Sequence, residues 1–257
     1  MIRKGTQALA LVALAALASA SRADVFAYAT DTASMLYSVN LTTGAKTLIG
    51  PEGAFLESLA LSPGGELYGA DTIGDIYQLD TTTGAGTLVG STGLGNIEGM
   101  DFDGGTLLAT DFGSIPNVYT IDVTNGTPTL VSTFDTETGA VRTFAMKDSA
   151  TMMARCDLPG PNSLYSVAFP GGTATHIGAM GGNIFAAMDY ASDGLLYAMD
   201  GDGSIHLVND ATGETTFVSD TGEDFWLGMA SNPVPEPATF LVLGVGAALL
   251  IGRARRK

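Results

Sequence analysis

The stretch at residues 67–90, LYGADTIGDIYQLDTTTGAGTLVG, decides the fold, because related stretches recur along most of the chain. Two β-prone runs, at residues 67–70 and 76–79, are separated by a polar turn with a glycine. A second glycine-containing loop leads to a third run at residues 87–89. Short apolar runs divided by such turns are typical of antiparallel strands joined by hairpins. With the run at residues 99–102 that follows, the stretch predicts one four-stranded antiparallel sheet.

Four types of strand recur five times in the same order. The first type ends in aspartate and occurs at residues 26–31, 67–71, 107–111, 153–157 and 196–200. The second type, such as IYQLD, begins at residues 36, 76, 118, 164 and 205, and the third, such as TLVG, begins at residues 47, 87, 129, 175 and 216. Second-type strands are 40, 42, 46 and 41 residues apart, a period typical of propeller blades. The sequence therefore predicts an all-β fold, a five-bladed β-propeller with four-stranded blades.

The fourth strand type bears on how the ring closes. It occurs at residues 58–61, 99–102, 143–146, 187–190 and 228–231. The predicted propeller domain, residues 24–232, thus begins with a first-type strand and ends with a fourth-type strand. If the fourth type is innermost, residues 228–231 pair with residues 26–31, and the N- and C-terminal strands close the propeller within one blade. Closure removes an open sheet edge. An open β-solenoid is the alternative arrangement.

The predicted propeller domain is strongly acidic, which restricts its partners. The chain has 27 acidic and 11 basic residues, but seven of the basic residues lie in the two terminal segments. Between residues 24 and 234, four basic residues stand against 26 acidic ones, a net charge of -22. Such a surface repels phosphate backbones, so nucleic acid is not expected as a partner. It suits a soluble extracellular protein, a binder of cations or a partner of neutral polymers.

The N-terminal segment, residues 1–23, is predicted to be a signal peptide. Arg3 and Lys4 precede an uninterrupted apolar run at residues 8–18, and small residues suitable for signal peptidase follow. An uncleaved anchor is the alternative, but eleven apolar residues are short for a bilayer core of about 30 Å. We therefore expect an exported protein.

The C-terminal segment, residues 233–257, has three parts in a fixed order. The tetrapeptide VPEP precedes an apolar stretch at residues 238–252, and a basic end follows. The residues concerned are Val234, Pro235, Glu236 and Pro237 in the tetrapeptide, and Arg253, Arg255, Arg256 and Lys257 in the basic end. The prolines keep the tetrapeptide extended, and the apolar stretch is predicted to be a short transmembrane helix. A plain C-terminal membrane anchor is the alternative interpretation.

This tail resembles the PEP-CTERM sorting signal of exported bacterial proteins. The resemblance implies an exosortase, a membrane protease that cuts near the motif, as the processing partner. It also implies that the C-terminal helix holds the protein in the inner membrane until processing, after which the protein reaches the cell surface or extracellular matrix. Bacteria with such proteins commonly make exopolysaccharide. An exopolysaccharide or a surface protein is therefore an expected partner.

The body also resembles known propellers, through the pattern GMDFDGGTLLATD followed by IYQLDTTTG. The similarity is to NHL-like and lactonase-like β-propellers over residues 24–232. The lactonase-like group implies a metal-dependent hydrolase as an alternative function, but no catalytic set carries over from it to this sequence. The chain has no His-Glu-x-x-His, Gly-x-Ser-x-Gly or P-loop motif. A binding or structural module is therefore the favoured function.

Candidate site residues in the body are few. In a closed propeller, the aspartates that end the first strand type should form a ring on one face. These are Asp31, Asp71, Asp111, Asp157 and Asp200. One interpretation is that each carboxylate accepts backbone N–H groups in its own turn. The other is a Ca²⁺ site near the channel mouth, with Asp200 and Asp202 as its ligands and the other aspartates of the ring as further candidates. His176 and His206 are expected to face solvent, and Cys156 is expected to be a buried small hydrophobe rather than a reactive thiol.

Overall fold

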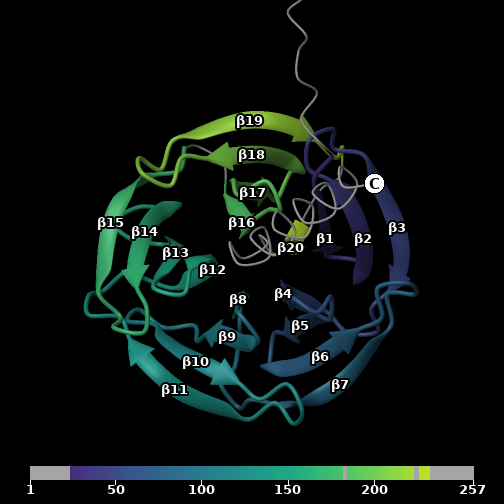
Figure 1. Ribbon diagram of the computed structural model, residues 1–257, viewed down its shortest axis with the longest axis horizontal. Coiled ribbons are helices and arrows are strands. Elements are labelled where there is room, and N and C mark those ends of the chain that lie inside the picture. The colour runs from purple at the N-terminus through teal and green to yellow at the C-terminus, as the bar shows by residue number, and fades with distance from the viewer. Residues whose placement is uncertain (1–23, 182–183, 223–225, 232–257) are drawn as a thin grey trace, which may run out of the picture.

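The structure is a computed structural model that describes residues 24–181, 184–222 and 226–231. The predicted signal peptide, the VPEP tetrapeptide, the predicted transmembrane helix and the basic end all lie outside these residues. The described residues form twenty strands joined by turns and loops, without helix. Five four-stranded sheets surround a central axis, as the ring of blades in Figure 1 shows. The prediction of an all-β, five-bladed propeller with four-stranded blades is confirmed.

The strands of each blade are given in order from the axis outward. The first blade consists of β20 (Trp226–Ser231), β1 (Phe26–Asp31), β2 (Met35–Asn40) and β3 (Lys46–Pro51). The second consists of β4 (Leu56–Leu61), β5 (Leu67–Asp71), β6 (Asp75–Leu79) and β7 (Gly86–Ser91).

The other three blades repeat this order without exchange of strands. The third consists of β8 (Gly99–Asp103), β9 (Thr106–Thr110), β10 (Asn117–Ile121) and β11 (Pro128–Thr133). The fourth consists of β12 (Val141–Asp148), β13 (Thr151–Cys156), β14 (Ser163–Ala168) and β15 (Ala174–Ala179). The fifth consists of β16 (Phe185–Tyr190), β17 (Leu196–Asp200), β18 (Ser204–Val208) and β19 (Thr215–Asp220).

The first blade joins the two ends of the described chain. β20 pairs antiparallel with β1, so that Tyr28 lies opposite Ala230 and Ala29 opposite Met229. The predicted closure by the N- and C-terminal strands is confirmed, and the fourth strand type is innermost in every blade. The assignment of residues 99–102 to the same sheet as residues 67–90 is wrong. A tight hairpin joins β4 to β5, which places β4 in that sheet, whereas residues 92–98 cross over to the next blade.

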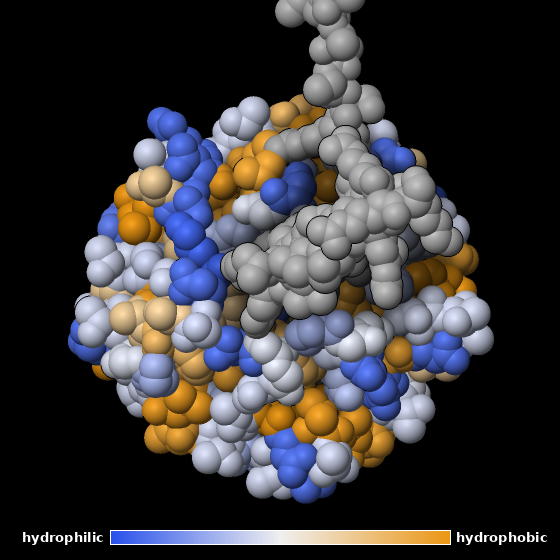
Figure 2. Space-filling view, in the orientation of Figure 1, coloured by the Kyte–Doolittle hydropathy of each residue, from blue (hydrophilic) through white to orange (hydrophobic). Residues whose placement is uncertain are grey.

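The hydrophobic core lies between neighbouring blades rather than in one central mass. Five clusters of buried side chains each combine residues of adjacent blades. In the cluster at the closing blade, Trp226 and Val39 of the first blade pack with Tyr197 and Met199 of the fifth. Each sheet is therefore apolar on both faces, because each face packs against a neighbour. Figure 2 shows apolar side chains in separate patches around the ring, with hydrophilic ones between them.

The antiparallel pairing defines two faces of the ring. Each inner strand begins beside the end of the second strand of its blade, as in the pairs Leu56 with Asp71 and Phe185 with Asp200. We call this side the aspartate face. The inner strands end on the opposite side, where β1 begins and Ser231 ends the described chain, with Ala27 opposite Ser231. We call that side the terminal face, because the chain enters and leaves the propeller there.

Candidate functional site at the channel mouth

The centre of the aspartate face is formed by one residue from the start of each inner strand. In four blades this residue is skipped in the pairing register, which is a β-bulge: Glu57, Arg142, Ala186 and Leu227. Glu98 occupies the corresponding position immediately before β8. A bulge turns a side chain away from the regular alternation of a strand. All five residues line one cavity of about 390 Å³, together with residues of the fourth and fifth blades. We call this cavity the channel mouth.

The channel mouth is asymmetric although the blades are repeats. The second and third blades contribute carboxylates, Glu57 and Glu98, and the fourth contributes Arg142. The fifth and first blades contribute apolar side chains, Ala186 and Leu227. In a repeat architecture, equivalent positions have equivalent surroundings, so a purely structural role would favour similar residues. The difference between the polar and apolar halves therefore marks this position as a candidate site.

Arg142 connects two acids across a blade boundary. Its Nη1 donates to Glu98 Oε1 at 3.1 Å and Oε2 at 3.0 Å, while its Nη2 donates to Asp157 Oδ2 at 2.8 Å. Its Nε lies within 3.1 Å of both Asp157 oxygens, and its guanidinium lies 4.7 Å from the ring centre of Phe112. These bonds, that to Asp157 most of all, raise the pKa of Arg142. The side chain is thus fixed as a wall of the channel mouth.

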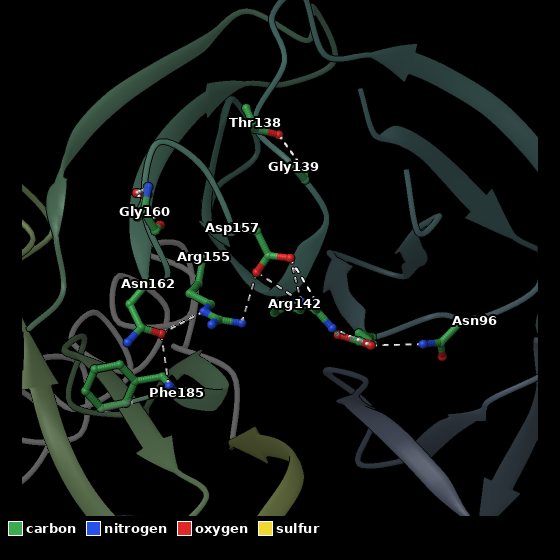
Figure 3. A network of polar contacts seen from close by, with 11 residues as sticks. Asn96, Thr138, Gly139, Arg142, Arg155, Asp157, Gly160, Asn162 and Phe185 are labelled. Atoms are coloured by element: carbon green, nitrogen blue, oxygen red, sulfur yellow. Dashed lines mark hydrogen bonds and ion pairs between the residues drawn. The ribbon is translucent and has the colours of Figure 1, made fainter. Parts of the chain in front are cut away.

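Arg155 is a second guanidinium at the channel mouth, and it is almost completely buried. Its side chain is 4% exposed, and its Nε donates to Asn162 Oδ1 at 2.9 Å. Its Nη1 lies 3.9 Å from Asp157 Oδ1, which is beyond hydrogen-bonding distance. Burial lowers the pKa of Arg155. Figure 3 shows this network, in which Arg155 lies between Asn162 and Asp157.

Within the described part of the chain, Glu57 is the acid of the channel mouth that forms no salt bridge with a guanidinium group. Its Oε2 is buried and has no hydrogen-bond partner among the described residues. Burial raises the pKa of Glu57, and the nearby charge of Glu98 raises it further. Asn96 lies beside the two acids and donates from Nδ2 to Glu98 Oε1 at 2.9 Å. The channel mouth therefore contains a protonatable carboxyl group next to a carboxylate fixed by Arg142.

The aspartates of the first strand type lie at equivalent places on the aspartate face, but four of them bind their own turns. Asp31 Oδ1 accepts from the N–H groups of Ala33 and Met35 at 2.9 and 3.0 Å. The same pattern holds for Asp71, which accepts from residues 73 and 75, and for Asp200, which accepts from residues 202 and 204. Asp111 accepts from the backbone and side-chain nitrogens of Asn117. These bonds fit the turn interpretation of the ring.

Asp157 is the member of the ring that departs from this role. Its turn, residues 157–162 between β13 and β14, contains two prolines, and its carboxylate binds Arg142 instead of the turn. The predicted ring therefore contributes one member, Asp157, to the channel mouth. Asp31, Asp71, Asp111, Asp200 and Asp202 do not line that cavity.

The predicted calcium ligands and the other candidates have clear positions. Asp200 is buried beneath its turn, with Asp202 exposed at the surface. In the described part of the chain, no group of three or more His, Cys, Asp or Glu side chains is placed to hold a metal ion. Calcium binding by Asp200 and Asp202 stays a prediction. Cys156 is fully buried and burial raises its pKa to about 12, which confirms the small buried hydrophobe.

The two histidines differ in their surroundings. His176 is exposed on β15, as expected. The expectation of a solvent-facing side chain is wrong for His206, whose side chain is 14% exposed and packs edge-on against Phe185 and Phe217. Burial lowers the pKa of His206. Phe217, the cross-strand neighbour on β19, covers the imidazole ring of His206. The alternation of residues along β18 alone did not reveal this contact.

Sequence reasoning missed Glu57, Glu98, Arg142 and Arg155 as site residues. One signal was available. The propeller domain has four basic residues, and three of them, Arg142, Lys147 and Arg155, fall within the fourth repeat. Two arginines within one repeat of so acidic a domain indicate that their guanidinium groups bind specific partners rather than add to solubility.

Two further acids lie deeper, on inner strands of the third and fifth blades. Asp101 Oδ2 accepts from the Met146 N–H at 2.6 Å, and Asp189 Oδ2 accepts from the Ser231 N–H at 2.6 Å. Each carboxylate thus ties its blade to the inner strand of the next one. Burial raises the pKa of both groups, that of Asp101 to about 7.

Comparison with known proteins shows what the two parts of the chain are similar to. The family described as the PEP-CTERM protein-sorting motif matches residues 233–257. No curated protein sequence matches the chain. In the described residues, no helix is both long enough and apolar enough to cross a membrane. The chain is thus a five-bladed propeller that carries a PEP-CTERM sorting motif, as predicted from its tail.

Solved structures resemble the propeller in fold. A gluconolactonase from Xanthomonas campestris shares 15% sequence identity, with 78% of each chain covered and a TM-score of 0.52. The computationally designed protein Ika8 shares 15% identity over 80% of this chain and 61% of its own, with a TM-score of 0.39. The WD40 β-propeller domain of Doa1 shares 10% identity over 75% and 78%, with a TM-score of 0.48. At such identities the likeness concerns the fold alone.

Proposed function

We propose that the protein is an exported bacterial surface protein, processed by an exosortase, whose propeller acts as a binding module through the channel mouth. The observation that carries the first part is the PEP-CTERM motif at residues 233–257, which implies an exosortase partner, export and sorting to the cell surface. The predicted signal peptide at residues 1–23 and the predicted apolar helix at residues 238–252 agree with this route.

The topology of the propeller supports the second part. The chain leaves the propeller at Ser231 on the terminal face, and the channel mouth lies at the opposite end of the inner strands. A protein held by its C-terminal tail in the inner membrane therefore directs the terminal face toward the tail and the channel mouth away from it. In that orientation the channel mouth is turned away from the membrane, so partners outside the cell can reach it.

The lactonase-like hydrolase considered from the sequence is not our proposal. The likeness to the gluconolactonase has a sequence identity of 15% and is a likeness of fold. Arg142 in the channel mouth is held by two carboxylates, which describes a rigid polar wall rather than a reactive group.

The sorting part is tested with the variant Glu236→Ala in the full-length protein. Glu236 has the only charge in the VPEP tetrapeptide, whereas insertion depends on the apolar stretch and the basic end. We expect the variant to accumulate unprocessed in the membrane fraction, as judged by fractionation and immunoblotting. Glu214→Ala, which changes an exposed glutamate of the propeller, is the matched control and should be processed normally. Normal processing of Glu236→Ala would refute recognition through this motif.

A further inference from the structure

The channel mouth presents a donor and an unsatisfied acceptor in the same cavity. Nη1 of Arg155 lies 3.9 Å from Asp157 Oδ1, which is beyond hydrogen-bonding distance, and so can donate to a ligand in the cavity. Glu57 Oε2 is buried without a donor among those residues. Buried polar groups in native proteins are almost always hydrogen-bonded, so Glu57 Oε2 calls for a donor. A ligand that completes both must donate and accept.

The charges of the channel mouth limit the ligand further. Glu98 and Asp157 are paired with Arg142, and Arg155 lies beside Asp157. The two carboxylates Glu98 and Asp157 balance the two guanidinium groups, and burial raises the pKa of Glu57 and so favours its neutral form. The cavity therefore has no excess charge that would favour a cation or an anion, which suits a neutral ligand. A hydroxyl group can donate to Glu57 and accept from Arg155, which an amine or a carboxylate cannot do in their charged forms.

The other half of the channel mouth is apolar. Ile184 is 65% exposed there, and Ala186, Leu227 and Phe185 line the same wall. A ligand with a hydroxyl edge and an apolar face therefore matches both walls. The cavity volume of about 390 Å³ lies within the range of small-molecule sites.

We propose that the channel mouth binds a neutral saccharide unit, with its hydroxyl edge on Glu57 and Arg155 and the C–H face of its ring on Leu227 and Ile184. This inference rests on the proposed function, in which the channel mouth is the binding site of a surface protein. It adds the ligand class, which the sorting motif does not specify.

The test uses the full-length protein in detergent and isothermal titration calorimetry. The neutral probes are cellotetraose, maltotetraose and xylotetraose. The charged probes are tetragalacturonate and the fully deacetylated chitosan tetramer. We expect at least one neutral tetrasaccharide to bind more tightly than both charged ones. Glu57→Ala should weaken that binding about tenfold, which is the effect of losing one hydrogen bond to a charged or strongly polar group.

Two further variants make the result specific. Ile184→Ala removes exposed apolar surface from the ring-stacking wall and should also weaken binding of the neutral probe. Glu66→Ala changes an exposed glutamate of the same blade as Glu57, at the β4–β5 hairpin on the terminal face, and should leave binding unchanged. The melting temperature of each variant is measured as well, and only variants that melt at the wild-type temperature are compared for binding. A folding defect is thereby detected separately.

Three outcomes would overturn the proposal. They are binding of none of the neutral probes, tighter binding of a charged probe, and an equal effect of Glu57→Ala and Glu66→Ala. Each of these leaves the processing of the C-terminal tail untouched. A failure of the ligand class is therefore distinguishable from a failure of sorting, which the Glu236→Ala variant reports.

Discussion

Single residues adapt a repeated scaffold to one site. The turn aspartates show the rule and its exception: Asp31, Asp71 and Asp200 bind backbone amides in their turns, whereas Asp157 binds Arg142. The cost of placing charged groups at the channel mouth is reduced because Arg142 is shared by two carboxylates with near-ideal distances. Among the described residues, the deeper acids Asp101 and Asp189 form no salt bridge, and their protonation should affect stability.

At the residue scale we predict that stability falls as the pH rises from about 5 to about 8. Burial raises the pKa of Asp101 from 3.8 to about 7 and that of Glu52 from 4.5 to about 8. Because the folded state then holds more protons than the unfolded state, these groups stabilise the fold at low pH. That contribution is lost as the pH rises through the folded-state values, by up to about 1.4 kcal/mol per pH unit for each group. Denaturant unfolding at several pH values measures the trend.

The variants Asp101→Asn and Glu52→Gln should each make this pH dependence shallower. Glu137→Gln, which changes an exposed glutamate, serves as the control and should leave the slope unchanged. A stability that rises across this range, or a slope unaffected by both buried variants, would contradict the assigned protonation states.

Strands and turns were the level at which sequence was most informative. The four strand types predicted five four-stranded sheets and the pairing of β1 with β20, because strand patterns and turn glycines are local signals, but residues 99–102 were assigned to the wrong sheet. The channel mouth was not predictable in the same way. Glu57, Arg142 and Leu227 lie at bulges, and a bulge depends on the register between two strands, which no single strand encodes. The orientation of Asp157 depends on Arg142, which is fifteen residues away.

At the element scale, Gly228 of β20 should resist substitution. A Cβ at this position would lie 3.0 Å from backbone atoms of Ser58 and Leu59 in the neighbouring inner strand β4. Backbone atoms cannot move aside as a flexible side chain can, so Gly228→Ala should destabilise the protein by about 1–3 kcal/mol. Gly201→Ala is the matched control, since nothing lies within 4 Å of its added methyl group. Chemical denaturation that gives equal stabilities for the two variants would argue against the close approach of β20 and β4.

Closure is a property of the whole molecule. Five blades form a ring because β20, the last described strand, completes the sheet begun by β1, the first. The two ends of the domain thus share one blade, and the pairing of β20 covers the edge that β1 would otherwise expose. The same contact brings Ser231, the last described residue, to the terminal face, at the end of the inner strands opposite to the channel mouth.

A chain that ends before residue 226 should therefore lose cooperative unfolding. Without β20, β1 is left as an exposed edge, and the apolar cluster of Trp226, Val39 and Tyr197 loses its largest side chain. We expect a broad thermal transition and aggregation, measured by calorimetry and light scattering. A transition as sharp as that of the complete domain, at an unchanged temperature, would show that closure does not stabilise the ring.

In the proposed function, a sorting system cuts the C-terminal tail and delivers the propeller to the surface. Intact-mass spectrometry of the surface-exposed protein tests it most directly. We expect a mature C-terminus near the VPEP tetrapeptide, without the basic end at residues 253–257. A released protein that still ends in Lys257 would contradict it and leave the tail as a simple membrane anchor.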